Sequence, residues 1–178
     1  MKAQKTIIHW SRTLGFLLLV NCSSQQLSGP SILLVPPEQS PFYQPVPIAT
    51  GPFDEFQPTL SPNSPNIVFV SQQGGNLDLY RLLPNNPAPE RLTTHSTDDT
   101  EPKLSPSGEF IVWVSKASDV KGDIWLMNAD GTEAHPLTDR KTSDRSPIWH
   151  PNESSIFFTT RSVGERFERI EQLDLETG

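Results

Sequence analysis

The sequence has 178 residues, 34% of them hydrophobic, and a mean hydropathy of −0.43. This length favours a single domain with a modest core. The formal net charge is −7, and removing the three basic residues that precede Cys22 (Lys2, Lys5 and Arg12) leaves −10. A surface this acidic repels phosphate backbones, so we expect no nucleic-acid partner. Because the chain has one cysteine, an intrachain disulfide is excluded.

Residues 1–21 have the pattern of an export signal. A basic start is followed by the apolar run LGFLLLV (14–20), which is shorter than the roughly 20 residues of a membrane helix. The motif LVNC then resembles the lipobox of bacterial lipoproteins, with Cys22 as the lipidated residue. We expect a lipid anchor at Cys22 on the periplasmic side of a bacterial membrane. An ordinary secretory signal and an uncleaved anchor are the alternatives.

Residues 22–45 are rich in Ser, Gln and Pro and show no lasting helical or strand periodicity. Because proline removes backbone hydrogen-bond donors, we interpret this stretch as a semi-extended tether. The sequence therefore divides into a signal at 1–21, a lipid-attachment cysteine with its tether at 22–45, and a domain at 46–178.

The domain repeats itself with a period of about 45 residues. Prolines that open similar segments lie 44 and 45 residues apart: Pro58, Pro102 and Pro147. The prolines of the following turns have the same spacing: Pro62, Pro106 and Pro151. The motifs DLY (78–80) and DIW (123–125) are also 45 residues apart. Several independent markers therefore agree on one repeat.

Each repeat divides into four short strands. The second strand is the most apolar (IVFVS at 67–71, IVWVS at 111–115, IFFTT at 156–160), which predicts that both of its faces are buried. The turn before it combines Pro with Asn or Gly (SPNSPN, SPSG, HPNES), as in antiparallel hairpins. Four antiparallel strands per repeat, packed on both faces, predict an all-β fold made of β-propeller blades.

The stretch SPSGEFIVWVSKASDVKGDIWLMNADGTEAHPLT (105–138) resembles the repeat of TolB-type propellers, with its Ser-Pro turn, Asp-Ile-Tyr, Asn-Ala-Asp-Gly and Leu-Thr motifs. The resemblance covers residues 56–138 closely and 143–178 more loosely. It implies a six-bladed ring and a Tol–Pal-like role in envelope integrity or biopolymer transport, with envelope proteins as partners. The same repeat also occurs in propellers attached to serine peptidases, so it specifies the fold better than the function.

We expect three four-stranded blades, the last of them incomplete, because IEQLDLETG (170–178) stops where a fourth strand would begin. VPIAT (46–50) precedes the first blade, and Ile48 lies ten residues before Pro58, as Leu92 does before Pro102. This spacing predicts a fourth strand placed ahead of its blade. The leading hypothesis is a homodimer in which two three-blade arcs form one six-bladed ring. An open arc capped by another protein and a truncated relic of a longer propeller are the alternatives.

The sequence predicts no catalytic residue and no cofactor site. A nucleophile needs a base within hydrogen-bond reach, and the four histidines are dispersed. His9 lies in the signal, His95 in a loop, His135 at a turn and His150 in the Ser position of a Ser-Pro turn. No Gly-x-Ser-x-Gly motif is present.

A metal hypothesis rests on carboxylates in the loops that lead into the first strands: Asp54, Glu55, Asp98, Asp99, Glu101 and Asp144. In a propeller such loops ring the mouth of the central channel, where carboxylates could hold Ca²⁺. A solvated polar rim without a metal is the favoured interpretation. Asp78 and Asp123, which recur before the third strands, are interpreted as turn caps.

These features together predict an exported, lipid-anchored and non-catalytic propeller that mediates protein–protein interaction. The alternative function is an exported propeller module that binds a ligand or a glycan.

Overall fold

The computed structural model describes residues 8–9, 18–19, 45–49 and 51–175. The chain forms two compact units, Met1–Val46 and Pro47–Gly178. In the first unit, β1 (Ile8–His9) pairs with β2 (Leu18–Leu19) in antiparallel register. Cys22 and the predicted tether, apart from Pro45, lie outside the described residues, as does most of the predicted signal. In the part of the chain that is described, no helix is long and apolar enough to cross a membrane.

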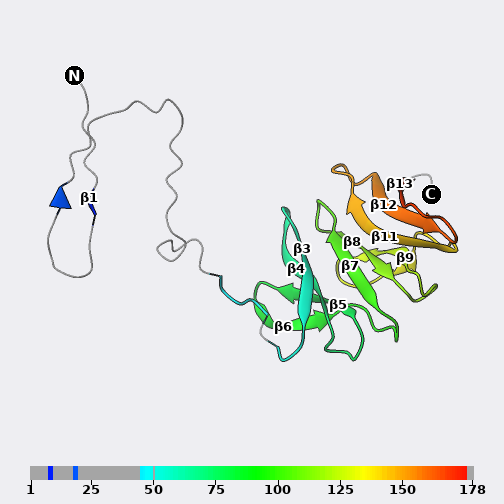
Figure 1. The fold of residues 1–178 in the computed structure, drawn as a ribbon. Coiled ribbons are helices and arrows are strands. Elements are labelled where there is room, and N and C mark those ends of the chain that lie inside the picture. Colours follow the sequence, from blue (N-terminus) through cyan, green and yellow to red (C-terminus); the bar gives the residue numbers. More distant parts are fainter. Residues whose placement is uncertain (1–7, 10–17, 20–44, 50, 176–178) are drawn as a thin grey trace, which may run out of the picture. The chain divides into compact units, whose positions relative to one another are not determined.

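The second unit consists of three antiparallel sheets, which are the three blades (Figure 1). The first blade contains β3 (Glu55–Ser61), β4 (Ser64–Ser71), β5 (Asp78–Leu83) and β6 (Asn86–Arg91). The second contains β7 (Asp99–Leu104), β8 (Phe110–Ser115), β9 (Asp123–Asn128) and β10 (His135–Pro136). The third contains β11 (Thr142–Trp149), β12 (Ser155–Ser162) and β13 (Arg169–Asp174). The predicted all-β partial propeller is confirmed.

The strands within each blade pair in chain order, so each blade is a simple antiparallel meander. The second blade lies between the first and the third (Figure 1). Its strand β8 is buried from Ile111 to Ser115, which agrees with the expectation that second strands bury both faces. Ile111 and Trp113 pack with Val68 and Leu79 of the first blade. Val114 packs with Phe158 of the third blade on the opposite side.

The first strand of each blade contains a bulge at the residue before its marker proline. These residues adopt a left-handed backbone, with φ of 52° at Gln57, 56° at Glu101 and 55° at Ser146. Such angles are uncommon outside glycine and are typical of bulged strands. The Gln57 Oε1 atom accepts a hydrogen bond from the backbone N–H of Glu101 at 2.8 Å, and Glu101 Oε2 accepts one from the N–H of Ser146 at 2.7 Å. The bulges therefore link the three blades to one another.

Further hydrogen bonds join the first strands and the following turns of adjacent blades. The Thr59 hydroxyl accepts a bond from the N–H of Leu104 at 3.1 Å. The indole N–H of Trp149 donates to the carbonyl of Lys103 at 2.9 Å. The Ser61 hydroxyl donates to the carbonyl of Pro106 at 2.7 Å. Polar groups on the first strands and their turns thus have hydrogen-bond partners in the neighbouring blade. These bonds satisfy backbone N–H and C=O groups at the junctions, which apolar side chains cannot do.

The fourth strands differ from the sequence prediction. Strand β6 begins at Asn86 and β10 is only two residues long, although Leu92 and Leu137 still donate their backbone N–H groups to Leu79 and Ile124 at 2.8 Å. Residues 45–49 are not a strand. A β-strand requires a hydrogen-bonded partner, and the described part of the chain pairs no strand with this segment. The third blade has three described strands, as expected for an incomplete blade.

We predict that stability depends on the packing between blades. Replacing the fully buried Ile111 by alanine removes contacts at the first junction and should lower the free energy of unfolding by about 2–5 kcal/mol. Val120, which is 82% exposed, is the matched control. Val120→Ala should change the free energy of unfolding by less than about 0.5 kcal/mol. Urea unfolding monitored by tryptophan fluorescence measures both values. Equal effects of the two substitutions would contradict the assigned core.

Candidate functional site

Four aspartates are completely buried at the junctions between blades: Asp78, Asp99, Asp123 and Asp144. Each lies at or near the start of a strand, Asp78 and Asp123 in the third strands and Asp99 and Asp144 in the first strands. The four aspartates lie as two pairs, one at each junction: Asp78 with Asp99, and Asp123 with Asp144. Within each pair the two carboxylates are close enough for electrostatic repulsion to raise a pKa. Charged groups are rarely buried without a compensating partner, so the surroundings of each pair decide its properties.

At the first junction, Asp78 has a full set of partners. The Arg91 guanidinium donates to Asp78 Oδ2 at 2.6 Å, and the side-chain amide of Asn76 donates to Oδ1 at 3.4 Å. Burial still raises the pKa of Asp78, because the favourable charge of Arg91 offsets only part of the desolvation. The indole N–H of Trp113 donates to Asp99 Oδ1 at 3.1 Å.

At the second junction, the equivalent partners are missing. The positions 45 residues after Arg91 and Asn76 are Pro136 and Lys121, and neither replaces the lost interactions. Both carboxylate oxygens of Asp123 are buried, and neither accepts a hydrogen bond of normal geometry from the described residues. Burial, with smaller contributions from the neighbouring acids, raises the pKa of Asp123 to about 6, against a lowering effect of the Arg140 backbone amide.

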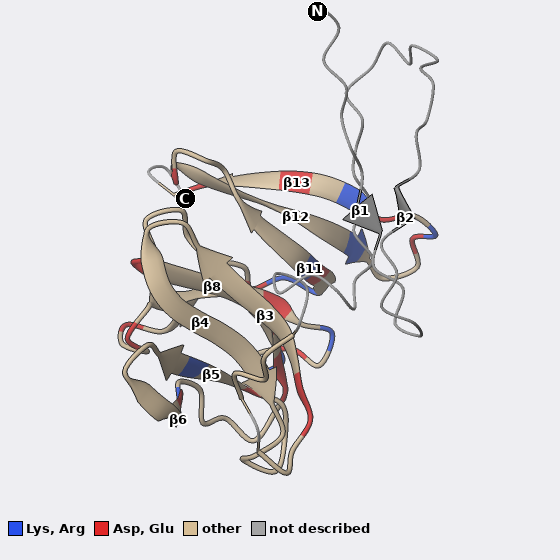
Figure 2. Ribbon diagram, turned by 90° about the vertical axis from the view of Figure 1, so that its left-hand side faces the viewer, with Lys and Arg blue, Asp and Glu red and all other residues tan. Residues whose placement is uncertain are grey.

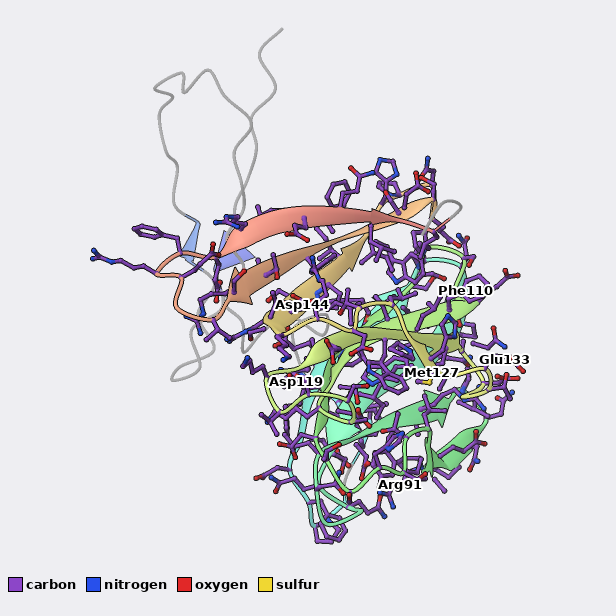
Figure 3. All side chains as sticks on the ribbon, turned by 90° about the vertical axis from the view of Figure 1, so that its right-hand side faces the viewer. Arg91, Phe110, Asp119, Met127, Glu133 and Asp144 are labelled. Atoms are coloured by element: carbon purple, nitrogen blue, oxygen red, sulfur yellow. The ribbon has the colours of Figure 1, made fainter. Side chains whose placement is uncertain are left out.

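Its neighbour Asp144 is well satisfied. The hydroxyl groups of Thr142 and Thr160 donate to Asp144 Oδ1 at 2.8 and 2.5 Å. Arg140 donates to Oδ2 at 3.2 Å and also to Glu171 of the third blade at 2.7 Å. The Arg140 guanidinium therefore pairs with Asp144 and Glu171. Among the described residues, Asp123 has no such charge partner, so its ionised form is less favourable than that of Asp144. Asp144 and the nearby loop residue Asp119 are labelled in Figure 3.

The acidic residues proposed as a channel rim do not form one cluster. Asp98 is paired with Lys116 at 2.9 Å, and Glu101 accepts a hydrogen bond from the next bulge. Asp99 and Asp144 are buried at different junctions. Within the described ranges, no three carboxylate, histidine or cysteine side chains are placed to hold a metal ion. The sequence interpretation of Asp78 and Asp123 as turn caps missed their burial, which only the neighbouring blade creates.

The described histidines make local contacts. His95 packs edge-on against Trp125, with ring centroids 5.9 Å apart. His135 Nδ1 lies 2.7 Å from the Glu133 carbonyl, and His150 Nδ1 contacts the Asn152 side chain. None of these three rings has a hydrogen bond to a serine, threonine or cysteine side chain among the described residues. A catalytic nucleophile–base pair is therefore not formed by them.

Comparison with known proteins agrees with this architecture. A family model described as the TolB beta propeller domain matches residues 46–178, so the chain belongs to this family. No curated protein matches the chain. Among solved structures, a putative TolB from Agrobacterium tumefaciens is 20% identical with a TM-score of 0.64, covering 72% of this chain and 48% of its own.

Two further structures show how widely the fold is used. TolB from Acinetobacter baumannii is 20% identical, with a TM-score of 0.60, and covers 68% of this chain and 30% of its own. An oligogalacturonate lyase from Vibrio parahaemolyticus is 14% identical, with a TM-score of 0.59, and covers 77% and 44%. The chain thus spans less than half the length of these structures, and the likeness concerns the fold alone.

We predict that Asp123 destabilises the folded protein at neutral pH. Its folded-state pKa is about 6, above the unfolded value of about 3.9, so folding favours the protonated form. Stability should therefore fall as the pH rises from about 4 to about 6 and then level off. Asp123→Asn should raise the free energy of unfolding at pH 7.5 by on the order of 2 kcal/mol, with little effect at pH 4.

Asp98→Asn is the matched control with the opposite sign. The hydrogen bond from Lys116 lowers the pKa of Asp98, so this carboxylate stabilises the folded state above the unfolded pKa and loses that effect as the pH falls. The substitution should lower stability at pH 7.5 by less than about 1 kcal/mol, because the pair is partly exposed. Denaturant unfolding at both pH values measures each variant. A loss of stability in Asp123→Asn at pH 7.5 would contradict the assignment.

Proposed function

We propose that the chain is an exported, non-catalytic propeller module that binds a protein of the bacterial envelope, and that a lipid on Cys22 anchors it there. The observation that carries the proposal is the match of residues 46–178 to the TolB beta propeller domain, together with blades held rigidly by junction cores and interblade hydrogen bonds. Rigid blades keep loops in fixed relative positions, which lowers the entropy lost when a partner binds.

The polar side chains of the blades support binding rather than catalysis. Serines of the hairpin turns serve the structure: the Ser61 hydroxyl donates to the next blade, and the Ser105 hydroxyl contacts Ser107 at 2.9 Å. The three described histidines make the local contacts given above. Because solved structures of similar fold include a lyase and a peptidase by name, the fold by itself does not exclude an enzyme, and these side-chain contacts are a second support for the proposal.

The binding surface that we propose is formed by the loops at the channel mouth. Residues 116–122 connect β8 to β9, and residues 139–141 lead into β11. The two loops are joined, because Lys121 Nζ lies 3.2 Å from the Lys141 carbonyl and the Ser143 hydroxyl lies 3.2 Å from the Lys121 carbonyl. Glu133, at the opposite end of β9, lies far from this surface (Figure 3). A Tol–Pal-like role makes a peptidoglycan-associated lipoprotein the partner to test first.

Binding should depend on the mouth loops. Isothermal titration with the peptidoglycan-associated lipoprotein of the same bacterium tests the proposal directly. We expect Asp139→Lys, a charge reversal at an exposed loop residue, to weaken binding at least tenfold, since rim charges tune association. Glu133→Lys makes the same charge change at the other end and should bind like the unaltered protein. Absence of binding by the unaltered protein, or equal loss in both variants, would contradict the proposal.

Membrane attachment should depend on Cys22. Because this is the only cysteine, incorporation of radiolabelled palmitate can be assigned to it. We expect the unaltered chain, expressed in a Gram-negative host, to carry label and to sediment with membranes. Cys22→Ser should lose the label and leave the membrane fraction. Unlabelled protein that still sediments with membranes would indicate an uncleaved anchor in place of a lipid.

A further inference from the structure

Exposed large apolar side chains gather at the two ends of the row of blades. At the first-blade end they are Ile48, Phe53 and Leu60. At the third-blade end they are Ile148, Val163, Phe167 and Ile170. The middle blade contributes only Val120 among the described residues. Exposed apolar surface that gathers in this way marks an interaction site.

The outer face of the first blade repeats a surface that forms a junction core elsewhere in the molecule, and its central residues Phe69 and Tyr80 are each only 4% exposed. Phe69 and Tyr80 are cross-strand neighbours, as are the equivalent Trp113 and Trp125 of the second blade. The tryptophans face the first blade and contribute to the junction core. Beside Phe69 lies a hollow of about 170 Å³, whose lining includes Phe56, Ile67 and Leu82. A neighbouring blade would fill the equivalent place.

Residues 48–49 contact the face of the first blade that points away from the second blade. Leu92, from the end of the first blade, packs into the first junction core, and Leu137 packs into the second. Ile48 has the same spacing of ten residues before its marker proline and lines the hollow, although it is 64% exposed. The next residue, Ala49, packs against Phe69, Tyr80 and Leu82.

The third blade offers the strand that this segment lacks. Within the described residues, β13 pairs only with β12 (Figure 2). Its register places Ile170 opposite Thr159, the position that Leu79 and Ile124 hold in the first two blades. The carbonyls of Leu79 and Ile124 accept the N–H groups of Leu92 and Leu137. By equivalence, the Ile170 carbonyl is the acceptor for the N–H of Ile48.

We propose that a second copy of the chain occupies both ends. Residues 46–49 of each copy add a fourth strand beside β13 of the other copy, and the third blade of each covers the hollow on the first blade of the other. The outer face of the third blade is suited to this, because Ile148 and Phe157 are cross-strand neighbours and Ile170 lies on the adjacent strand. The two contacts are identical by a two-fold axis and close one six-bladed ring.

A second copy is favoured over an unrelated partner because the chain itself carries both halves of the contact. The outer face of the first blade has the residue pattern that packs against a preceding blade, with Phe69 opposite Tyr80. The third blade has the strand β13 beside which a fourth strand would pair, with Ile170 opposite Thr159. Internal junctions built from the same positions are already packed in this molecule. A partner without this repeat would need both a strand that forms the backbone hydrogen bonds with β13 and an apolar surface that fits the outer face of the first blade.

A site-specific disulfide tests the predicted strand pairing. In the full chain with Cys22→Ser, one preparation carries Ile48→Cys and a second carries Ile170→Cys, and the two are mixed and oxidised. Directly opposed strand residues have Cβ atoms about 5 Å apart, which is close enough for a disulfide after small adjustment. We expect a band near twice 19.9 kDa in the absence of reductant, and reductant should convert it to the monomer. Mixing Val120→Cys with Ile170→Cys is the control and should give no such band.

Sedimentation velocity in a density-matched detergent gives the second readout. The Cys22→Ser chain should sediment as two copies, and Ile170→Lys should sediment as one copy with an unchanged circular dichroism spectrum, because Ile170 is 77% exposed. Val120→Lys should remain a dimer. The proposal is overturned by a monomeric parent chain, by a dimer that Ile170→Lys leaves intact, or by a disulfide that forms within one chain carrying both cysteines.

Discussion

Each blade of this protein is a sheet with two apolar faces, so the fold depends on a neighbouring blade to cover each face. Strand β8 shows the constraint most directly, since Ile111 and Trp113 pack toward the first blade while Val114 packs toward the third. An isolated blade would leave both of these sets in water. The cooperative unit is therefore the junction between blades. Binding of another blade at an outermost face would bury further apolar surface and so stabilise the fold most.

The polar structure follows the same constraint. Left-handed bulges at Gln57, Glu101 and Ser146 cost backbone strain, and the hydrogen bonds between successive bulges offset it. These bonds connect equivalent atoms of consecutive repeats, so they hold the blades at a constant angle. The segment 139–141 leads directly into β11, one of these bulged strands, so its position is tied to the same set of hydrogen bonds.

The buried aspartates show how a repeat changes once its copies diverge. Asp78 is paired with Arg91, whereas the equivalent Asp123 faces a position where proline has replaced arginine. The fourth strand is also shorter in the second blade, with two residues in β10 against six in β6. Without a charge partner at the equivalent position, burial raises the pKa of Asp123 to about 6. The second junction is therefore less stable at neutral pH than its packing alone would make it.

The sequence by itself determined the repeat, the strands and the class of fold, because a period of 45 residues with alternating turns and apolar strands leaves few other architectures. It also predicted a strand at residues 46–50, which the described residues 45–49 do not form. Only the tertiary structure decided which carboxylates are buried: Asp99 is buried and Asp98 is paired at the surface, although they are adjacent. Asp98 pairs with Lys116, 18 residues further along the chain, and Asp99 accepts a hydrogen bond from Trp113, 14 residues further along. These contacts form only when the strands pair and pack, so no local sequence pattern contains that information.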